Sequence, residues 1–358
     1  MDDRHAFHEE HGARFETVAG REVVTRYRRP ARTHRAVRNG VGVTEHPFGV
    51  IVVEGEDRVE YIDNVLTNTV PTTDGRGTYA LLLDPQGRIS TDLYVFNAGE
   101  RLLLFTPPGR ATPTADGWET FIQDVTITVA SGDFAVFSVH GPTATEKVAS
   151  VLAGAAAPGE PLTFVRGSIA DVGVSAVRDD NIVGEEGYFV ISQAEGAVDV
   201  LDDLVNHGPA AVPFGRATWG ALTLEAGTPI FPAELDGRIP NVVGLRSAMD
   251  FEKGCYVGQE VVSRIENRGQ PPNRLVGLRV DTLPDAGAAV MAGDDAIGEI
   301  TRAAESPLLD AAVAFAFVDF EFEGEVTVRI DGHDVSAELT PLPLVETEFP
   351  SRRLPRYE

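Results

Sequence analysis

Cysteine and lysine are almost absent from this sequence. Its 358 residues contain one cysteine, Cys255, and two lysines, Lys147 and Lys253. One cysteine cannot form an internal disulfide, and it cannot by itself build a multi-cysteine zinc or iron–sulfur site. The eight histidines show no spacing typical of metal ligands. We therefore expect no metal centre that this chain builds alone.

Basic charge is also scarce, because 55 acidic residues outnumber 30 basic ones and leave a net charge of −25. At low ionic strength such an excess repels itself, whereas concentrated salt screens the repulsion. Together with the loss of lysine, this favours a protein from a halophile; an acidic protein from an ordinary cytoplasm is the alternative. The same charge argues against strong nucleic-acid binding, which depends on neutralising phosphates.

Long apolar runs are missing as well. No stretch of 18 apolar residues is present, which excludes an ordinary membrane-spanning helix. The first five residues, Met-Asp-Asp-Arg-His, do not resemble a signal peptide. We expect a cytoplasmic protein without a membrane partner, long enough to form two or three domains.

One segment departs from the acidic average. Residues 21–40 contain seven arginines and a single acid, Glu22. Two interpretations stay open at this point. The arginines form a solvated surface that pairs with acids elsewhere, or they face an anion such as a polyglutamate tail or RNA.

Hydrophobic periodicity predicts an α+β protein that becomes rich in strands toward its C-terminus. Strands are predicted over 48–53, 78–83, 89–96, 101–106, 120–130, 134–139, 169–177, 188–191 and 274–280. Helices are predicted over 56–66, 142–152, 195–206 and 219–226. The last strand-rich segment ends near residue 345, and a surface tail follows it.

The strand over 89–96 has two distinct faces. A two-residue period places Ser90, Asp92, Tyr94 and Phe96 on one face. Ile89, Thr91, Leu93 and Val95 then point the other way.

The rare cysteine and one of the rare lysines lie two residues apart, in the run Lys-Gly-Cys-Tyr-Val-Gly-Gln-Glu at 253–260. A nearby cation favours the thiolate, which is the reactive form of cysteine. Glycines on both sides allow a tight turn that exposes the sulfur. We predict catalytic roles for Cys255 and Lys253, with Tyr256 and Gln259 positioning the loop or a ligand; a buried structural cysteine is the alternative.

Several motifs, in order along the chain, resemble the glycine cleavage T-protein (aminomethyltransferase) superfamily. They are His-Gly-Ala-Arg-Phe at 11–15, Gln-Gly-Arg-Ile-Ser-Thr-Asp-Leu at 86–93, His-Gly-Pro at 140–142, Leu-Thr-Leu-Glu-Ala-Gly at 222–227 and Gly-Glu-Ile-Thr at 298–301. The run at 253–260 differs from the T-protein and is similar to the signature of the YgfZ-type relatives.

The resemblance implies a three-domain α+β arrangement around a central folate channel, with a C-terminal β-barrel domain. We place a folate-binding region of two interleaved subdomains at 1–270, the barrel at 271–346 and the surface tail at 347–358. Tetrahydrofolate, or a one-carbon derivative of it, is the implied cofactor.

The resemblance also assigns roles to single residues. Asp92 matches the T-protein's catalytic aspartate, which contacts the folate nitrogen that receives the one-carbon unit, and Tyr94 shares its strand face. The T-protein's pterin-reading glutamate and arginine fall at Phe189 and Trp219. Aromatic rings lose the paired hydrogen bonds of those groups, although they can stack on a flat ring; simple core packing is the alternative.

Three functions remain in competition. The first is a YgfZ-type folate-binding accessory protein that supports iron–sulfur client or assembly proteins through Cys255. The second is an aminomethyltransferase-like enzyme that uses Asp92. The third is a folate-binding scaffold without chemistry. The motif at 253–260 favours the first, and Asp92 supports the second.

Overall fold

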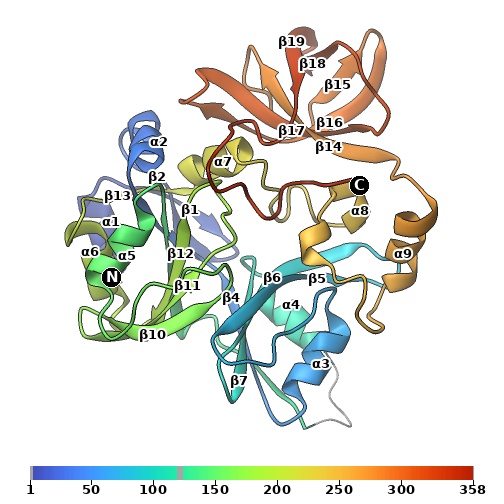
Figure 1. The fold of residues 1–358 in the computed structure, drawn as a ribbon. Helices are drawn as coiled ribbons and strands as arrows, with labels where there is room; N and C mark the ends of the chain where they lie inside the picture. Colours follow the sequence, from blue (N-terminus) through green and yellow to red (C-terminus); the bar gives the residue numbers. More distant parts are fainter. Residues whose placement is uncertain (1–2, 119–123, 358) are drawn as a thin grey trace.

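Two open β-sheets and a β-barrel surround the centre of the molecule (Figure 1). The computed structural model describes residues 3–118 and 124–357. The fold confirms the predicted α+β class and the β-barrel at the C-terminal end.

The first sheet has five strands and carries the predicted two-faced strand next to its edge. In spatial order the strands are β5 (Arg76–Leu83), β6 (Ile89–Asn97), β7 (Arg101–Thr106), β4 (Gly49–Glu54) and β8 (Thr126–Val129). Two short helices cover its outer face, α3 (Arg58–Val65) and α4 (Ala111–Asp116). The predicted strand over 120–130 is seen as β8, and its residues 120–123 lie outside the described part.

The second sheet has six strands. Their order is β10 (Phe164–Ile169), β11 (Val172–Arg178), β12 (Gly187–Gln193), β9 (Phe134–His140), β3 (Gly42–His46) and β13 (Val212–Pro213). Helices α5 (Ala144–Val151) and α6 (Ala197–Asn206) pack on its outer face. The strand predicted over 169–177 is seen as β11, but it starts too early. Ala170 and Asp171 adopt positive φ angles of 48° and 64° and turn the chain between β10 and β11, so Ile169 belongs to β10.

The closed barrel has six strands, β14 (Asn273–Val280), β17 (Ala311–Asp319), β16 (Asp295–Ser306), β15 (Ala289–Ala292), β18 (Val326–Ile330) and β19 (His333–Thr340). Helix α7 (Arg216–Glu225) lies between the second sheet and the barrel (Figure 1). The segments α8 (Pro240–Val243), η1 (Arg246–Ala248) and α9 (Gln259–Arg268) lead from α7 to the barrel.

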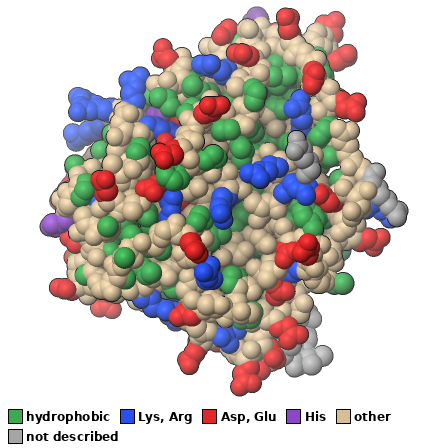
Figure 2. Space-filling view, in the orientation of Figure 1, with side chains coloured by type: hydrophobic (Ala, Val, Ile, Leu, Met, Phe, Trp, Pro, Cys, Tyr) green, Lys and Arg blue, Asp and Glu red, His purple; other side chains and the backbone are tan. Residues whose placement is uncertain are grey.

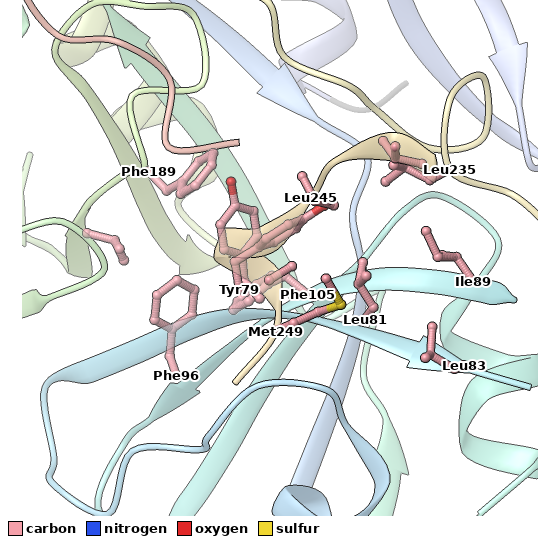
Figure 3. Close-up of a cluster of buried hydrophobic side chains, with 14 of the residues drawn as sticks. Tyr79, Leu81, Leu83, Ile89, Phe96, Phe105, Phe189, Leu235, Leu245 and Met249 are labelled. Carbon is pink, nitrogen blue, oxygen red and sulfur yellow. The ribbon is translucent and has the colours of Figure 1, made fainter. Parts of the chain in front are cut away.

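One apolar cluster joins all three sheets. Because side chains alternate along a strand, Phe189 of β12 and Phe105 of β7 point into this cluster, and Phe315 of β17 in the barrel packs there as well. Figure 3 shows Phe189 facing Tyr79 and Phe105 across the gap between the sheets. The alternate residues of the same strands, such as Val190 and Ala316, pack into the separate cores of their own domains. This shared cluster fixes the position of the three sheets around the centre.

The N-terminal elements were not predicted from periodicity. They are α1 (Asp3–Glu10), the hairpin of β1 (Arg14–Val18) and β2 (Arg21–Arg26), and α2 (Pro30–Asn39). In the arginine-rich segment, Arg38 is buried and its Nε donates to Glu225 Oε2 at 2.9 Å, and Arg21 Nη1 donates to the carbonyl of Phe48 at 3.2 Å.

The other five arginines of this segment are exposed, at positions 26, 28, 29, 32 and 35. Among the described residues, no ion pair involves them. Figure 2 shows basic side chains gathered at the edge where α2 lies in Figure 1. The interpretation of this surface as an anion-facing one stays a prediction.

The C-terminal tail, predicted to lie on the surface, does so only in part. From the barrel it runs back to the centre of the molecule and ends beside α8 (Figure 1). Ser351 and Arg353 are each 3% exposed. Within the described ranges, no helix is both long and apolar enough to cross a membrane.

Candidate functional site

A cavity of about 260 Å³ lies where the sheets, the barrel and the tail meet. Each surrounding element contributes side chains to its wall. Among them are His46 from the end of β3, Asp92 and Tyr94 from β6, Trp219 from α7, Arg302 from β16 and Arg353 from the tail. The predicted pair Asp92 and Tyr94 therefore does share one face of its strand, and that face is directed at the cavity.

One oxygen of the Asp92 carboxylate has a hydrogen-bond donor, and the other is buried without one. The hydroxyl of Tyr79 donates to its Oδ2 at 2.8 Å. Its Oδ1 is buried and has no hydrogen-bond partner among the described residues. A buried acceptor without a partner is costly in free energy, so Oδ1 is an acceptor that the described residues leave unsatisfied beside the cavity.

Arg353 connects Asp92 to a second buried acid, Asp180. Its Nη1 lies 3.5 Å from Asp92 Oδ2, and its Nε donates to Asp180 Oδ2 at 2.6 Å. Its Nη2 donates to the hydroxyl of Tyr94, which itself donates to Asp180 Oδ1 at 2.8 Å. The guanidinium carbon lies 3.6 Å from the centroid of the Tyr79 ring. The tail residue thus holds Asp92 and Tyr94 in one network.

Burial and charge oppose each other in this network. Burial raises the pKa of Asp92, while Arg353 and the hydrogen bond from Tyr79 act to lower it, and burial prevails. Burial raises the pKa of Tyr94 well above its ordinary value. Tyr94 therefore stays a neutral donor near pH 7.

A third buried acid, Asp179, lies outside the cavity lining. Burial, reinforced by the neighbouring Asp180, raises the pKa of Asp179 to about 7. Its Oδ2 lies 3.4 Å from Nδ1 of His140, whose pKa burial lowers well below the usual value. Both groups favour their neutral forms, as expected where water is excluded.

The two aromatic residues predicted to face the pterin ring occupy different positions. Trp219 lines the cavity. Phe189 is 2% exposed and lies behind the wall, with its ring centroid 5.2 Å from that of Tyr94. Its position agrees with the alternative of core packing, whereas Trp219 can contact a bound ring directly.

Sequence reasoning overlooked His46, which packs edge-on against Trp219 at 4.6 Å between ring centroids. Its Nε2 forms a hydrogen bond of 2.8 Å with Ser138 Oγ. Burial, together with Arg216, lowers the pKa of His46 to about 3, so the imidazole is neutral near pH 7. The sequence does contain one indication that His46 belongs to the site: the two-residue alternation of β3 directs Thr44 and His46 to the same face.

The loop at 253–260 does not reach the cavity, so the predicted site residues form two separate groups. Cys255 is exposed. Lys253 Nζ donates to the carbonyls of Asp63, Leu66 and Asn68 at 2.6, 3.1 and 3.1 Å. The ammonium therefore anchors the loop to the C-terminal end of α3, where a cation is favourable. An effect of Lys253 on the thiol of Cys255 stays a prediction.

The other two residues predicted in this loop have structural contacts. Tyr256 is 7% exposed and packs in the central apolar cluster. Gln259 begins α9, directly after Gly258, which has a φ of 83°. Neither residue lines the cavity that contains Asp92.

One cluster of potential metal ligands lies at the end of α6, in Asp202, Asp203 and His207. All three side chains already have partners. His207 Nδ1 lies 2.6 Å from Asp203 Oδ1, and the nearby Asn206 donates to Asp202 Oδ1 at 2.8 Å. None of the three lines the cavity.

Comparison with known proteins identifies the family. The model of the GCVT N-terminal domain matches residues 4–253, and that of the glycine cleavage T-protein C-terminal barrel domain matches residues 273–346. The chain belongs to the glycine cleavage T-protein family.

Relatives and solved structures agree with this assignment. An aminomethyltransferase of Cutibacterium acnes is 31% identical, with 88% of this chain and 89% of the relative covered. One from Streptomyces coelicolor is 28% identical, with 97% of this chain and 96% of the relative covered. The crystal structure of the glycine cleavage system aminomethyltransferase T from Bartonella henselae has a TM-score of 0.85 at 23% identity, over 97% of this chain and 98% of that one. This T-protein family member therefore shares the whole fold of the solved structure.

Proposed function

We propose that the protein binds tetrahydrofolate in the central cavity and transfers a one-carbon unit to it, as an aminomethyltransferase-like enzyme. The observation that carries the proposal is the carboxylate of Asp92, whose Oδ2 is held by Tyr79 while Oδ1 is buried without a partner among the described residues. The names of the relatives that cover nearly the whole chain support the same reaction class.

Asp92 can perform two tasks in such a transfer. Its unpartnered oxygen can accept a hydrogen bond from the folate nitrogen that receives the one-carbon unit, which fixes that nitrogen for attack. The carboxylate also stabilises the positive charge that develops when the nitrogen forms its new bond to carbon. Arg353 and Tyr79 hold the carboxylate in place for both tasks.

Binding can be measured through Trp219, because only one other tryptophan, Trp118, is present and it packs among the outer-face residues of the first sheet. In a Trp118→Phe background, titration with tetrahydrofolate should change the Trp219 fluorescence with a saturable curve. No saturable binding up to millimolar concentration would remove the proposal. Binding without any one-carbon transfer would instead leave the protein as a folate-binding scaffold.

A second candidate function is that of a YgfZ-type accessory protein for iron–sulfur proteins, and the exposure of Cys255 favours it. An exposed thiol can react with, or be shared with, a partner protein. Cys255→Ser should leave folding and folate binding intact and abolish the support of iron–sulfur enzymes in a deletion strain. Full complementation by Cys255→Ser, together with a native thiol inert to iodoacetamide, would eliminate this candidate.

A further inference from the structure

Most polar side chains on the cavity wall already bond to other parts of the chain. Arg302 donates to the side chains of Glu234 and Thr223 and to the carbonyl of Thr228. Arg353 is held by Asp180. Groups bonded in this way shape the wall, but their hydrogen bonds are not free for a ligand.

The imidazole of His46 differs from these groups because only one of its nitrogens is engaged. Nε2 pairs with Oγ of Ser138, which is fully buried in β9. Nδ1 forms no hydrogen bond with the described residues, and it is not one of the buried atoms that lack a partner. Since the side chain lines the cavity, Nδ1 is open to it.

Aromatic rings fix the orientation of this imidazole. The ring centroids of Trp219, Phe48 and Phe189 lie 4.6, 5.2 and 6.0 Å from that of His46. Trp219 and Phe48 also line the cavity. The open nitrogen is therefore presented beside two apolar surfaces, an arrangement that suits the polar edge of a flat ring.

The neutral imidazole can serve either as donor or as acceptor at Nδ1. The hydroxyl of Ser138 can rotate to donate to Nε2 or to accept from it. Each choice fixes the opposite role for Nδ1. A single side chain can thus match either a carbonyl or a ring nitrogen on a ligand.

We propose that His46 is a specificity-determining residue of this cavity, and that its Nδ1 makes a hydrogen bond to the polar edge of the ligand's heterobicyclic ring. This inference rests on the proposed folate-binding function and names the contact that reads the ring. The hydrogen bond from Nδ1 to the ring edge is then one between neutral groups, not an ion pair.

Two amide substitutions separate this role from a structural one. The amide group of asparagine lies about where Nδ1 is, and that of glutamine reaches about as far as Nε2. His46→Asn therefore keeps the group that faces the ligand and loses the contact with Ser138, whereas His46→Gln does the reverse. For tetrahydrofolate, followed by Trp219 fluorescence in the Trp118→Phe background, we expect His46→Asn to bind within about threefold of the parent and His46→Gln about tenfold more weakly.

His333→Asn provides the matched control, because His333 is exposed in the barrel strand β19 and does not line the cavity. It should bind like the parent. Thermal unfolding of each variant shows whether the fold is intact, and the double substitution His46→Phe with Ser138→Ala removes both hydrogen-bonding partners without leaving a buried hydroxyl unpaired. That variant should fold and bind about tenfold more weakly.

The outcomes are distinct from those that test the proposed function. If the parent protein binds tetrahydrofolate but His46→Gln binds as well as the parent, the role assigned to Nδ1 is wrong. Equal losses in the Asn and Gln variants, with intact folds, would also overturn it. If the parent protein itself does not bind, the proposed function fails and this inference fails with it.

Discussion

The guanidinium of Arg353, in the C-terminal tail, lies 3.5 Å from the carboxylate of Asp92 in strand β6. Both side chains are buried, and Arg353 also donates to Asp180 at 2.6 Å. The last segment of the chain therefore completes a site whose acidic groups come from strand β6 of the first sheet and from the loop that follows β11 of the second.

Removal of Arg353 should destabilise the fold strongly. Arg353→Ala leaves Asp92 and Asp180 buried without their counter-charge, and breaking a buried pair in this way costs about 3–5 kcal/mol. Urea denaturation measures the change in the free energy of unfolding. Arg352→Ala, at the exposed neighbouring position, should stay within about 0.5 kcal/mol of the parent. Similar values for both variants would contradict the structural role of Arg353.

The raised pKa of Asp179 predicts that the free energy of unfolding depends on pH. Its pKa is raised to about 7 in the fold by burial and by Asp180, whereas an unfolded aspartate titrates near 4. A raised pKa means that its contribution to stability is complete below pH 4 and is lost as the pH rises toward 7. Asp179→Asn cannot ionise, so its stability relative to the parent should increase between pH 4 and pH 7.

Free energies of unfolding at pH 4, 5.5 and 7, at constant salt, provide the measurement. The difference between Asp179→Asn and the parent should grow across these three values. A constant difference would show that Asp179 titrates normally in the fold.

Part of this site follows from the sequence. The two-residue period of β6 correctly places Asp92 and Tyr94 on one face, because each face of that strand meets a different apolar cluster. The same rule fails at Ile89, which packs in the central cluster on the side of Tyr94 and Phe96. A register shift between Leu82 and Leu83 in the adjacent strand marks where the regular alternation ends.

The contacts of Arg353 and Lys253 could not be derived from local pattern. Each is a charged residue in a polar, glycine- or proline-containing segment with other charged residues beside it, and such residues usually stay in solvent. Their partners are distant in the sequence: Tyr94 and Asp180 for Arg353, and the end of α3 for Lys253. Rarity of lysine marks Lys253 as unusual, but it cannot distinguish an anchor from a catalytic group.

Lys253 should contribute to stability through its carbonyl contacts. Lys253→Met removes the donor to three carbonyls and the ion pair with Asp63 at 3.1 Å. We expect a loss of about 1.5–3 kcal/mol, the range for hydrogen bonds that involve a charged group. Arg264→Met, which breaks only an exposed pair with Glu260 on α9, should change stability by less than about 0.5 kcal/mol.

The rate of Cys255 alkylation by iodoacetamide in the same Lys253→Met variant tests the predicted effect on the thiol. A lower rate at neutral pH, in a variant that remains folded, is expected if Lys253 favours the thiolate. An unchanged rate would leave the lysine with its anchoring role alone.

The net charge of −25 predicts a dependence on salt. Repulsion among the acidic groups weakens as ions screen it, so the denaturation midpoint should rise from dilute to molar KCl. A midpoint that stays flat or falls would remove the interpretation of the composition as an adaptation to high salt.

Substitution of Asp92 by asparagine, with binding and one-carbon transfer measured on the same protein, tests the central claim most directly. The change is nearly isosteric, and the asparagine amide oxygen can still accept from Tyr79. Tetrahydrofolate binding should therefore persist, while one-carbon transfer falls about a hundredfold or more, the usual worth of a positioned acid or base. Equal transfer rates in Asp92→Asn and the parent protein would contradict the role assigned to Asp92.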